Sequence, residues 1–252
     1  MEDFFFSVWF SSKFPVLAGI TTRSAGNSKL EKKRREIARR LNISYSRITT
    51  GEQVHKDGIA IVGEKDPGRK FPAVDGLITN QSNIPLAIFV ADCPPIFILD
   101  PQKKIGALLH AGWRSTIAGI SPQAVEIMAR VFRVKPKNLL VVIGPHICKE
   151  CYQVPWSPVA KAFSQLFDSF GKEILSSVIS ESSQRRAQFS SEGLWSIDLA
   201  KANSYQLERA GVLRENIEIS SICTYEDKNF FSYRRDKTSA GRMMALLQLN
   251  FS

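Results

Sequence analysis

The stretch VADCPPIFILDPQKKIGALLHAGWRS, residues 90–115, is the part of the chain that most constrains its fold. Two apolar runs, residues 96–100 and 104–111, are separated there by a short polar segment that contains a proline. Proline at the second position of a four-residue turn is favoured because its φ angle is preset. The sequence therefore predicts a β-hairpin whose two strands are buried.

The geometry of this hairpin brings two chemically active residues together. If Pro101 and Gln102 are the two loop residues, Cys93 falls opposite His110, with Cβ atoms about 5 Å apart. The prolines after Cys93 cannot donate ladder hydrogen bonds, and a bulge would shift the register by one. In either register the two residues lie at the same end of the sheet, where loops commonly form a site.

The rest of the chain alternates strand and helix patterns. Further β-branched or apolar runs predict strands over residues 85–91, 138–144 and 217–223. Amphipathic patterns predict helices over residues 29–41, 121–132, 159–167 and 198–210, the last with Asp198 as N-cap and Gly211 as its stop. Nearly continuous apolar strands indicate burial on both faces. We expect an α/β fold with mixed sheets.

We expect a single domain over residues 1–252, because neither repeats nor linker-like segments divide the chain. Residues 176–193 are the most loop-like stretch and are expected to link helices or to carry an insertion. The first residues lack the features of a secretory signal, and no apolar run approaches the roughly 20 residues of a membrane span. The chain is therefore expected to be soluble and cytoplasmic, without a membrane partner.

The net charge and the number of cysteines indicate which ligands the protein favours and which class of scaffold it is not. A net charge of +10 favours anionic ligands without naming one. Much of this charge lies in the helix predicted over residues 29–41, for which a solvated surface is favoured over a polyanion-binding patch. Four cysteines are too few for a disulfide-rich secreted scaffold.

The chain has only three histidines, and two of them, His55 and His110, lie like Cys93 in segments that the sequence predicts to be turns at strand ends. Two imidazoles and one thiolate form a three-ligand zinc site with an open fourth position. Without a metal, the same residues form a thiolate nucleophile with an imidazole base. Taken alone, Cys93 would be read as a small buried apolar residue and His110 as a core histidine. Their joint placement, with Asp92 before the thiol and Arg114 after His110, favours a site. The spacing leaves metal and nucleophile chemistry both open.

Cys148 and Cys151 form a C-x-x-C pair, which is typical of a redox pair or of half a zinc site. No second C-x-x-C or C-x-x-H completes it in the sequence. A fortuitous pair is therefore favoured, and the proximity of His146, whose role the sequence leaves open, is the one argument against it.

Six segments together carry a family resemblance. They are QVH (53–55), DGLIT (75–79), ADCPP (91–95), HAGWRSTIAGI (110–120), IGPHICKECYQV (143–154) and FFSYRRDKTSAGRM (230–243). The chain resembles the laccase-domain family, also called the multicopper polyphenol oxidase or purine nucleoside phosphorylase family. The resemblance implies an α/β/β/α layered fold related to Cys-His hydrolases, with His55, Cys93 and His110 as a zinc-binding catalytic trio.

The activities implied by the resemblance are phosphorolysis of adenosine, inosine and methylthioadenosine to base and sugar phosphate, and adenosine deamination. The expected partners are thus a purine nucleoside and phosphate, with no specific nucleic acid. Three histidines cannot fill the blue and trinuclear copper sites of a true multicopper oxidase, although a single copper could replace zinc at the trio. Arg23, Arg114 and Arg234 are candidate phosphate anchors, since arginine matches phosphate oxygens well.

Gln53 and Asp92 complete the expected substrate contacts. Two alternatives to the phosphorylase remain open. One is a Cys-His amide hydrolase that acts in the editing of cell-wall peptides, and the other is a non-catalytic polyanion binder that uses the basic helix.

Overall fold

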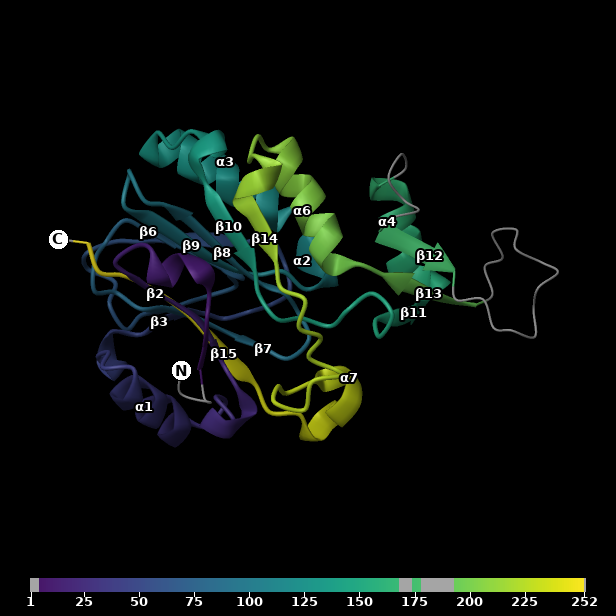
Figure 1. Cartoon of the computed structure of the whole chain (residues 1–252), viewed down its shortest axis with the longest axis horizontal. Helices are drawn as coiled ribbons and strands as arrows, with labels where there is room; N and C mark the ends of the chain where they lie inside the picture. Colours follow the sequence, from purple (N-terminus) through teal and green to yellow (C-terminus); the bar gives the residue numbers. More distant parts are fainter. Residues whose placement is uncertain (1–4, 168–173, 178–192, 252) are drawn as a thin grey trace.

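The computed structural model describes residues 5–167, 174–177 and 193–251. In this part of the chain, two six-stranded sheets pack face to face, and helices cover their outer faces (Figure 1). The strand order of the first sheet is β1 (Phe5–Ser7), β2 (Val16–Thr21), β15 (Met243–Leu249), β7 (Leu86–Val90), β3 (Thr49–Gly51) and β5 (Lys70–Phe71). The order of the second is β14 (Ile217–Ile219), β10 (Leu140–Ile143), β8 (Pro95–Asp100), β9 (Ile105–His110), β6 (Gly76–Thr79) and β4 (Ile59–Val62).

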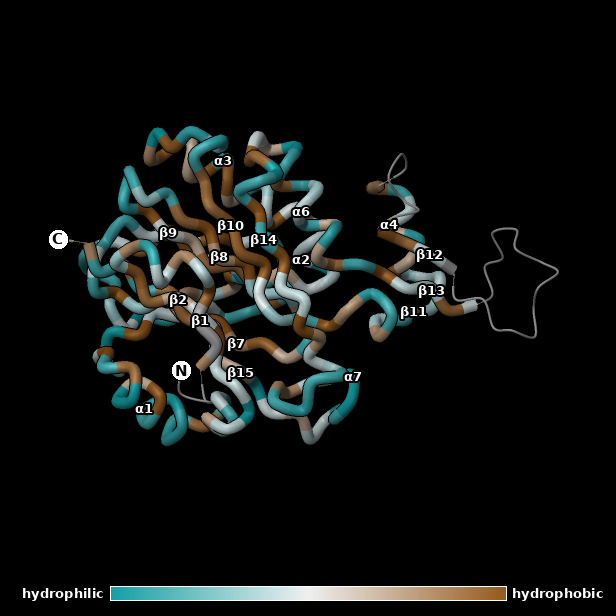
Figure 2. Tube along the Cα trace, in the orientation of Figure 1, coloured by the Kyte–Doolittle hydropathy of each residue, from teal (hydrophilic) through white to brown (hydrophobic). Residues whose placement is uncertain are grey.

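The main core lies between the two sheets. Ile88 and Leu247 of the first sheet join Phe97 and Leu108 of the second in one buried cluster. Every residue of β8 and β9 is buried. The prediction that these continuous apolar runs form strands covered on both faces is therefore confirmed. Figure 2 shows this pattern as hydrophobic central strands beneath a largely hydrophilic exterior.

Helices form the two outer layers. Helices α3 (Ile120–Phe132) and α6 (Leu199–Arg209) pack on the second sheet, and α1 (Glu31–Arg40) packs on the first (Figure 1). Parallel and antiparallel pairs occur in both sheets. The predicted α/β class with mixed sheets and the α/β/β/α layering are both confirmed.

A third, small sheet lies at one end of the sandwich, with strand order β11 (Gln153–Pro155), β13 (Leu194–Ile197) and β12 (Leu175–Ser177) (Figure 1). It packs with α4 (Lys161–Leu166) and the preceding π-helical turn Trp156–Ala160. The other described helices are α2 (Trp113–Ile117), α7 (Tyr233–Asp236) and 3-10 turns at Trp9–Ser12, Arg23–Ala25, Tyr45–Arg47, Pro136–Asn138, Arg214–Asn216 and Lys237–Ser239. None of the helices in the described ranges is long and apolar enough to cross a bilayer.

Most predicted elements are confirmed to within a few residues. The predicted strand over residues 217–223 is shorter, since β14 covers only Ile217–Ile219. Asp198 caps α6 by accepting a hydrogen bond from the backbone N–H of Lys201 at 2.8 Å, and Gly211 follows the helix with a left-handed φ of +94°. The loop expected over residues 176–193 falls largely on residues 178–192, which lie outside the described part of the chain.

The central hairpin exists, but its predicted register is wrong. In the antiparallel β8–β9 pair, Asp100 lies opposite Ile105, and Pro95 lies opposite His110. Cys93 therefore precedes the paired region by two residues instead of facing His110 across it. The loop spans residues 101–104 and has four residues instead of two.

The side chain of Asp100 explains the longer loop. Its Oδ1 atom accepts hydrogen bonds from the backbone N–H groups of Gln102 at 3.0 Å and Lys103 at 2.9 Å. Aspartate commonly forms such local turns. Lys104 then takes a left-handed φ of +55°, which returns the chain to the sheet.

Candidate metal and active site

Three connections between the two sheets meet beside the end of β9. The chain passes from the first sheet to the second through residues 52–58, 72–75 and 91–94, which lead into β4, β6 and β8. The first residues of β6 and β8 pair with the last residues of β9, and β4 begins beside β6. The fold thus gathers three irregular segments at one edge of the sandwich.

Two of these connections carry His55 and Cys93, and the end of β9 carries His110, the third residue predicted to form the site. His55, Cys93 and His110 each present one ligand atom, and these atoms all lie within 4.8 Å of one another. The two imidazole rings meet edge to face, with centroids 4.7 Å apart. His110 is buried, Cys93 is half-buried and His55 is exposed, so the site opens toward solvent on the side of His55.

Asp75 holds this arrangement together. Its Oδ1 atom lies 2.7 Å from Nδ1 of His110, and because a carboxylate only accepts, Nδ1 donates and Nε2 is left for Cys93. Its Oδ2 atom accepts from the backbone N–H groups of Val54 at 2.9 Å and Lys56 at 3.0 Å. These two bonds flank His55, whose backbone is left-handed at φ +59°. A single buried carboxylate therefore orients one ring and fixes the turn that carries the other.

Apart from the quoted DGLIT segment, the sequence gives little sign of this role. An aspartate before an apolar strand is ordinarily read as a turn residue. Burial raises the pKa of the Asp75 carboxyl, but the hydrogen bonds from His110 and the backbone outweigh it and hold the pKa below its usual value. Asp75 is therefore ionised beneath the site.

The metal-free site favours a charge pair. Burial opposes ionisation of Cys93, yet the His110 and His55 imidazoles beside the sulfur lower the pKa of the thiol from 9 to about 6. Burial also opposes protonation of His110, yet the Cys93 thiolate and the Asp75 carboxylate raise its pKa to about 9. Near neutral pH, Cys93 and His110 thus form a thiolate and imidazolium pair.

The donor set also fits a zinc ion. Tetrahedral zinc with bonds of about 2.0–2.3 Å separates its ligand atoms by roughly 3.3–3.6 Å, so small shifts of the three side chains would enclose it. Gly112 leaves the necessary room, because a Cβ atom there would lie 3.0 Å from Sγ of Cys93 and 3.4 Å from Cδ2 of His55. Three protein ligands and an open fourth position are typical of a catalytic zinc site.

Known proteins resemble this chain in sequence and in fold. The model of the family described as multi-copper polyphenol oxidoreductase laccase matches residues 20–250. The chain belongs to this laccase family.

Several relatives of this chain are named purine nucleoside phosphorylases. The purine nucleoside phosphorylase YlmD of Geobacillus stearothermophilus is 32% identical over 258 residues, which cover 92% of this chain and 89% of that protein. Human purine nucleoside phosphorylase LACC1 is 30% identical over 208 residues, which cover 77% of this chain and 42% of the human protein.

Solved structures share the fold. The hypothetical protein YfiH of Bacillus licheniformis has a TM-score of 0.86 at 27% identity, covering 98% of this chain and 97% of that one. The structure of YlmD from G. stearothermophilus has a TM-score of 0.79 at 30% identity, with 94% and 93% covered.

The laccase family name refers to a multicopper oxidase, but this chain has too few histidine ligands for the copper sites of such an enzyme. Of its three histidines, His146 is buried away from the trio, and its Nδ1 atom lies 2.9 Å from the carbonyl oxygen of Gly144. Burial lowers the pKa of His146, so this ring is neutral at physiological pH. Two histidines and one cysteine can hold one metal ion, whereas a multicopper oxidase needs several sites.

Asp92 and Gln53, expected as substrate contacts, both form hydrogen bonds within the protein. The carboxylate of Asp92 accepts from the hydroxyl of Thr224 at 2.7 Å and from the backbone N–H of Arg234 at 2.6 Å. The side-chain amide of Gln53 pairs with the backbone of Phe89, accepting at 2.7 Å and donating at 2.9 Å. These contacts assign both residues to positioning the connections that carry Cys93 and His55.

The three candidate arginines differ in their surroundings. Arg23 is paired with Asp236 at 3.3 Å and lies over the ring of Phe231. Arg234 donates to the carbonyl of Gln153 at 2.7 Å. Arg114 is exposed and its guanidinium lies over the Trp113 ring. Within the described ranges this guanidinium forms neither an ion pair nor a hydrogen bond.

Tyr152 is a further residue of this region that the sequence pattern did not single out. Burial and the nearby Cys93 thiolate raise the pKa of its phenol, while the charges of Arg234 and Arg114 act in the opposite direction. The guanidinium of Arg234 lies 5.3 Å from the centre of the Tyr152 ring. The Tyr152 phenol thus interacts electrostatically with Cys93 on one side and with the guanidinium groups of Arg234 and Arg114 on the other.

Proposed function

We propose that this protein is a purine nucleoside phosphorylase that acts on adenosine, inosine and methylthioadenosine at the His55, Cys93 and His110 site. The observation that carries the proposal is the convergence of these side chains in a chain whose relatives, named purine nucleoside phosphorylases, match nearly its whole length. The positive charge of the chain suits an anionic co-substrate. A reduced, cytoplasmic setting, in which nucleosides and phosphate are available, is part of the proposal.

In the proposed phosphorolysis, a phosphate oxygen forms a bond to the anomeric carbon of the ribose as the bond to the purine nitrogen breaks. The electron pair passes to the purine, which takes up a proton, and ribose 1-phosphate is the second product. Arg114 is assigned to phosphate, because its guanidinium is exposed beside the site and free of the ion pair that holds Arg23. The protonated phenol of Tyr152 is assigned to hydrogen bonding with the nucleoside.

The proposal extends to adenosine deamination at the same site. A zinc ion held by the trio would supply water activated near neutral pH, the nucleophile that deamination requires. Asp75 would keep the His110 ring oriented, and Gly112 would keep the approach to Cys93 open.

Product analysis tests the proposed function. Purified protein is incubated with adenosine in the presence and absence of phosphate, and the bases and nucleosides are separated. We expect adenine only with phosphate and inosine in both cases. Cys93→Ala should abolish both products, and Arg114→Gln should mainly raise the KM for phosphate, whereas Arg130→Gln on the exposed face of α3 serves as the matched control. Formation of neither adenine nor inosine by the wild type would reject the proposal.

One observation favours a second candidate, the Cys-His amide hydrolase of cell-wall peptide editing. Cys93, His110 and Asp75 are arranged as a nucleophile, a base and the group that orients the base. This candidate predicts amide cleavage by metal-free protein and alkylation of Cys93 at a rate that chelators do not change. The phosphorylase proposal predicts faster alkylation once bound metal is removed.

The polyanion-binding alternative receives less support. Several cations of α1 are engaged within the helix, including Lys33 with Glu36 at 2.9 Å and Arg35 with Glu31 at 2.6 Å. Arg34 donates to the backbone carbonyls of Ser28 and Lys29. The basic face is thus partly neutralised, and we do not propose it as a binding surface.

A further inference from the structure

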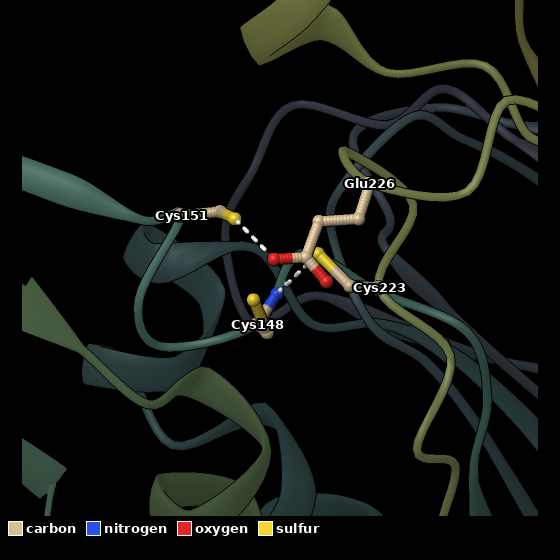
Figure 3. Close-up of side chains that lie close together, drawn as sticks. All are labelled: Cys148, Cys151, Cys223 and Glu226. Carbon is tan, nitrogen blue, oxygen red and sulfur yellow. Dashed lines mark hydrogen bonds between the residues drawn. The ribbon is translucent and has the colours of Figure 1, made fainter.

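A second cluster of potential metal ligands lies apart from the trio. Cys148, Cys151, Cys223 and Glu226 each present one ligand atom, and these atoms all lie within 4.8 Å of one another (Figure 3). The C-x-x-C pair, for which a fortuitous role was favoured from sequence, is joined by a C-x-x-E pair that begins 75 residues after Cys148. The second half of the cluster is thus a cysteine and a glutamate, which a search for cysteine and histidine spacings does not find.

Backbone structure positions both pairs. The carbonyl of Cys148 accepts from the backbone N–H groups of Cys151 at 3.2 Å and Tyr152 at 3.0 Å, which folds the C-x-x-C segment into a tight turn. The carbonyl of Cys223 accepts from the backbone N–H of Asp227 at 2.9 Å, which turns Glu226 back toward Cys223. A parallel bridge between His146 and Cys223 joins the two turns. The cluster therefore rests on paired backbone segments.

The four groups interact closely with one another. The backbone N–H of Cys148 donates to Sγ of Cys223 at 3.3 Å, and the thiol of Cys151 donates to a carboxylate oxygen of Glu226 at 3.4 Å (Figure 3). Burial and the Cys223 sulfur raise the pKa of Cys148 to about 11, and burial and neighbouring acidic groups also raise the pKa of Cys151.

A bound cation explains this composition better than a disulfide does. A carboxylate beside two cysteines disfavours the thiolate that disulfide exchange requires, and it adds no bond to the disulfide. A divalent cation is instead bound by three thiolates and a carboxylate together, and binding displaces the thiol protons. Three sulfurs and one oxygen form a closed four-ligand set of the kind that structural zinc occupies. The carboxylate oxygen argues against copper(I), which prefers sulfur ligands alone.

We propose that Cys148, Cys151, Cys223 and Glu226 form a structural zinc site, separate from the site of the trio. The segments that it joins also support the Cys93 turn. The backbone N–H of Ile147 donates to the carbonyl of Asp92 at 3.0 Å, and the hydroxyl of Thr224 donates to the Asp92 carboxylate at 2.7 Å. Zinc at this cluster therefore holds in place the two segments that bond to Asp92, next to Cys93, without contacting substrate.

Metal analysis of full-length variants tests the site. The background variant is Cys93→Ala, which leaves only the three cysteines of the cluster. We expect it to be purified with about one equivalent of zinc, as a four-ligand site requires. Adding Cys151→Ser should remove that zinc, adding Glu226→Gln should weaken its retention against a chelator, and adding Glu150→Gln, an exposed acid of the same turn, should leave it unchanged.

Cobalt substitution gives an independent reading. In the Cys93→Ala background, Co²⁺ should produce a thiolate-to-cobalt charge-transfer absorption that Cys151→Ser reduces and Glu150→Gln preserves. If Cys151→Ser fails to fold, the zinc retention of Glu226→Gln is compared with that of Glu150→Gln, and weaker retention in Glu226→Gln supports the site. Zinc content and cobalt absorption that are the same in all variants, or a Cys148–Cys151 disulfide in zinc-free protein purified without oxidant, would overturn the proposal.

Discussion

At the scale of single residues, Asp75 determines how the trio is arranged. Replacing Asp75 with asparagine preserves its size but removes the negative charge opposite His110. The amide has only one oxygen, so it can no longer accept hydrogen bonds both from His110 and from the backbone N–H groups beside His55. Loss of an outer partner of a metal-ligating histidine typically lowers metal affinity or activity about 10–100-fold. We expect Asp75→Asn to lower kcat for adenosine by this factor.

The matched control for this prediction is Asp66→Asn, which removes a half-buried loop carboxylate that bonds to Gly63 and Arg69. Steady-state kinetics and zinc content are measured for both variants. Equal activity of Asp75→Asn and the wild type would show that the carboxylate does not orient His110.

The charge state of Cys93 can be measured directly. A thiolate reacts faster than a thiol, and the thiolate fraction rises as the pH increases through the pKa. In metal-free protein the alkylation rate of Cys93 should therefore rise through about pH 6, because the neighbouring imidazoles lower its pKa to about 6. His110→Asn should move this rise to alkaline pH, because burial raises the pKa of Cys93 and the imidazole that mainly lowers it is then absent.

Mass spectrometry of the Cys93 peptide after reaction with iodoacetamide gives the rate at each pH. Cys148 and Cys151 should react slowly near neutral pH, because their pKa values are raised. A wild-type profile that rises only near pH 9 would contradict the thiolate and imidazolium pair.

At the scale of elements, the connections between the sheets are the functional parts of the fold. Gln53 ties the connection that carries His55 to β7 through both polar atoms of its amide. Gln53→Leu leaves the backbone N–H and carbonyl of Phe89 without these partners, at a cost of about 1–3 kcal/mol for each buried group. We expect a lower free energy of unfolding, measured by urea denaturation, with little change in the KM for phosphate.

Gln102→Leu in the exposed hairpin loop is the control for Gln53→Leu. A direct substrate contact at Gln53 predicts the opposite pattern, in which KM rises and the unfolding midpoint stays constant. That pattern would contradict the positioning role.

The elements themselves were largely predictable from the sequence. Apolar runs long enough for strands but too short for helices identified β7, β8, β9 and β10, and periodicity identified α3 and α6. The hairpin register was not predictable from proline alone, because the side chain of Asp100 lengthens the loop. Asp75 and Glu226 escaped detection because their partners come from distant segments, such as His110, 35 residues from Asp75, and Cys151, 75 residues from Glu226.

At the scale of the whole molecule, the site depends on how the two sheets are stacked, because three connections between them carry His55, Asp75 and Cys93. Phe97 is fully buried in the core that joins the sheets. Phe97→Ala should cost about 3–5 kcal/mol. For a domain of this size each kcal/mol lowers Tm by roughly 2–4 °C.

Val131→Ala is the control for Phe97→Ala, since Val131 is 47% exposed on α3 and should change Tm little. Calorimetry gives Tm for both variants. Equal Tm values would show that the packing between the sheets does not hold the molecule together at Phe97.

The central claim is that His55, Cys93 and His110 converge on one metal ion. The most direct test is an anomalous difference map recorded at the zinc absorption edge from crystals of the wild-type protein. We predict a peak about 2.3 Å from Sγ of Cys93 and about 2.0–2.1 Å from Nε2 of His110 and a ring nitrogen of His55. A map without a peak between these residues, in a structure where the Cys93 sulfur faces away from both rings, would contradict the claim.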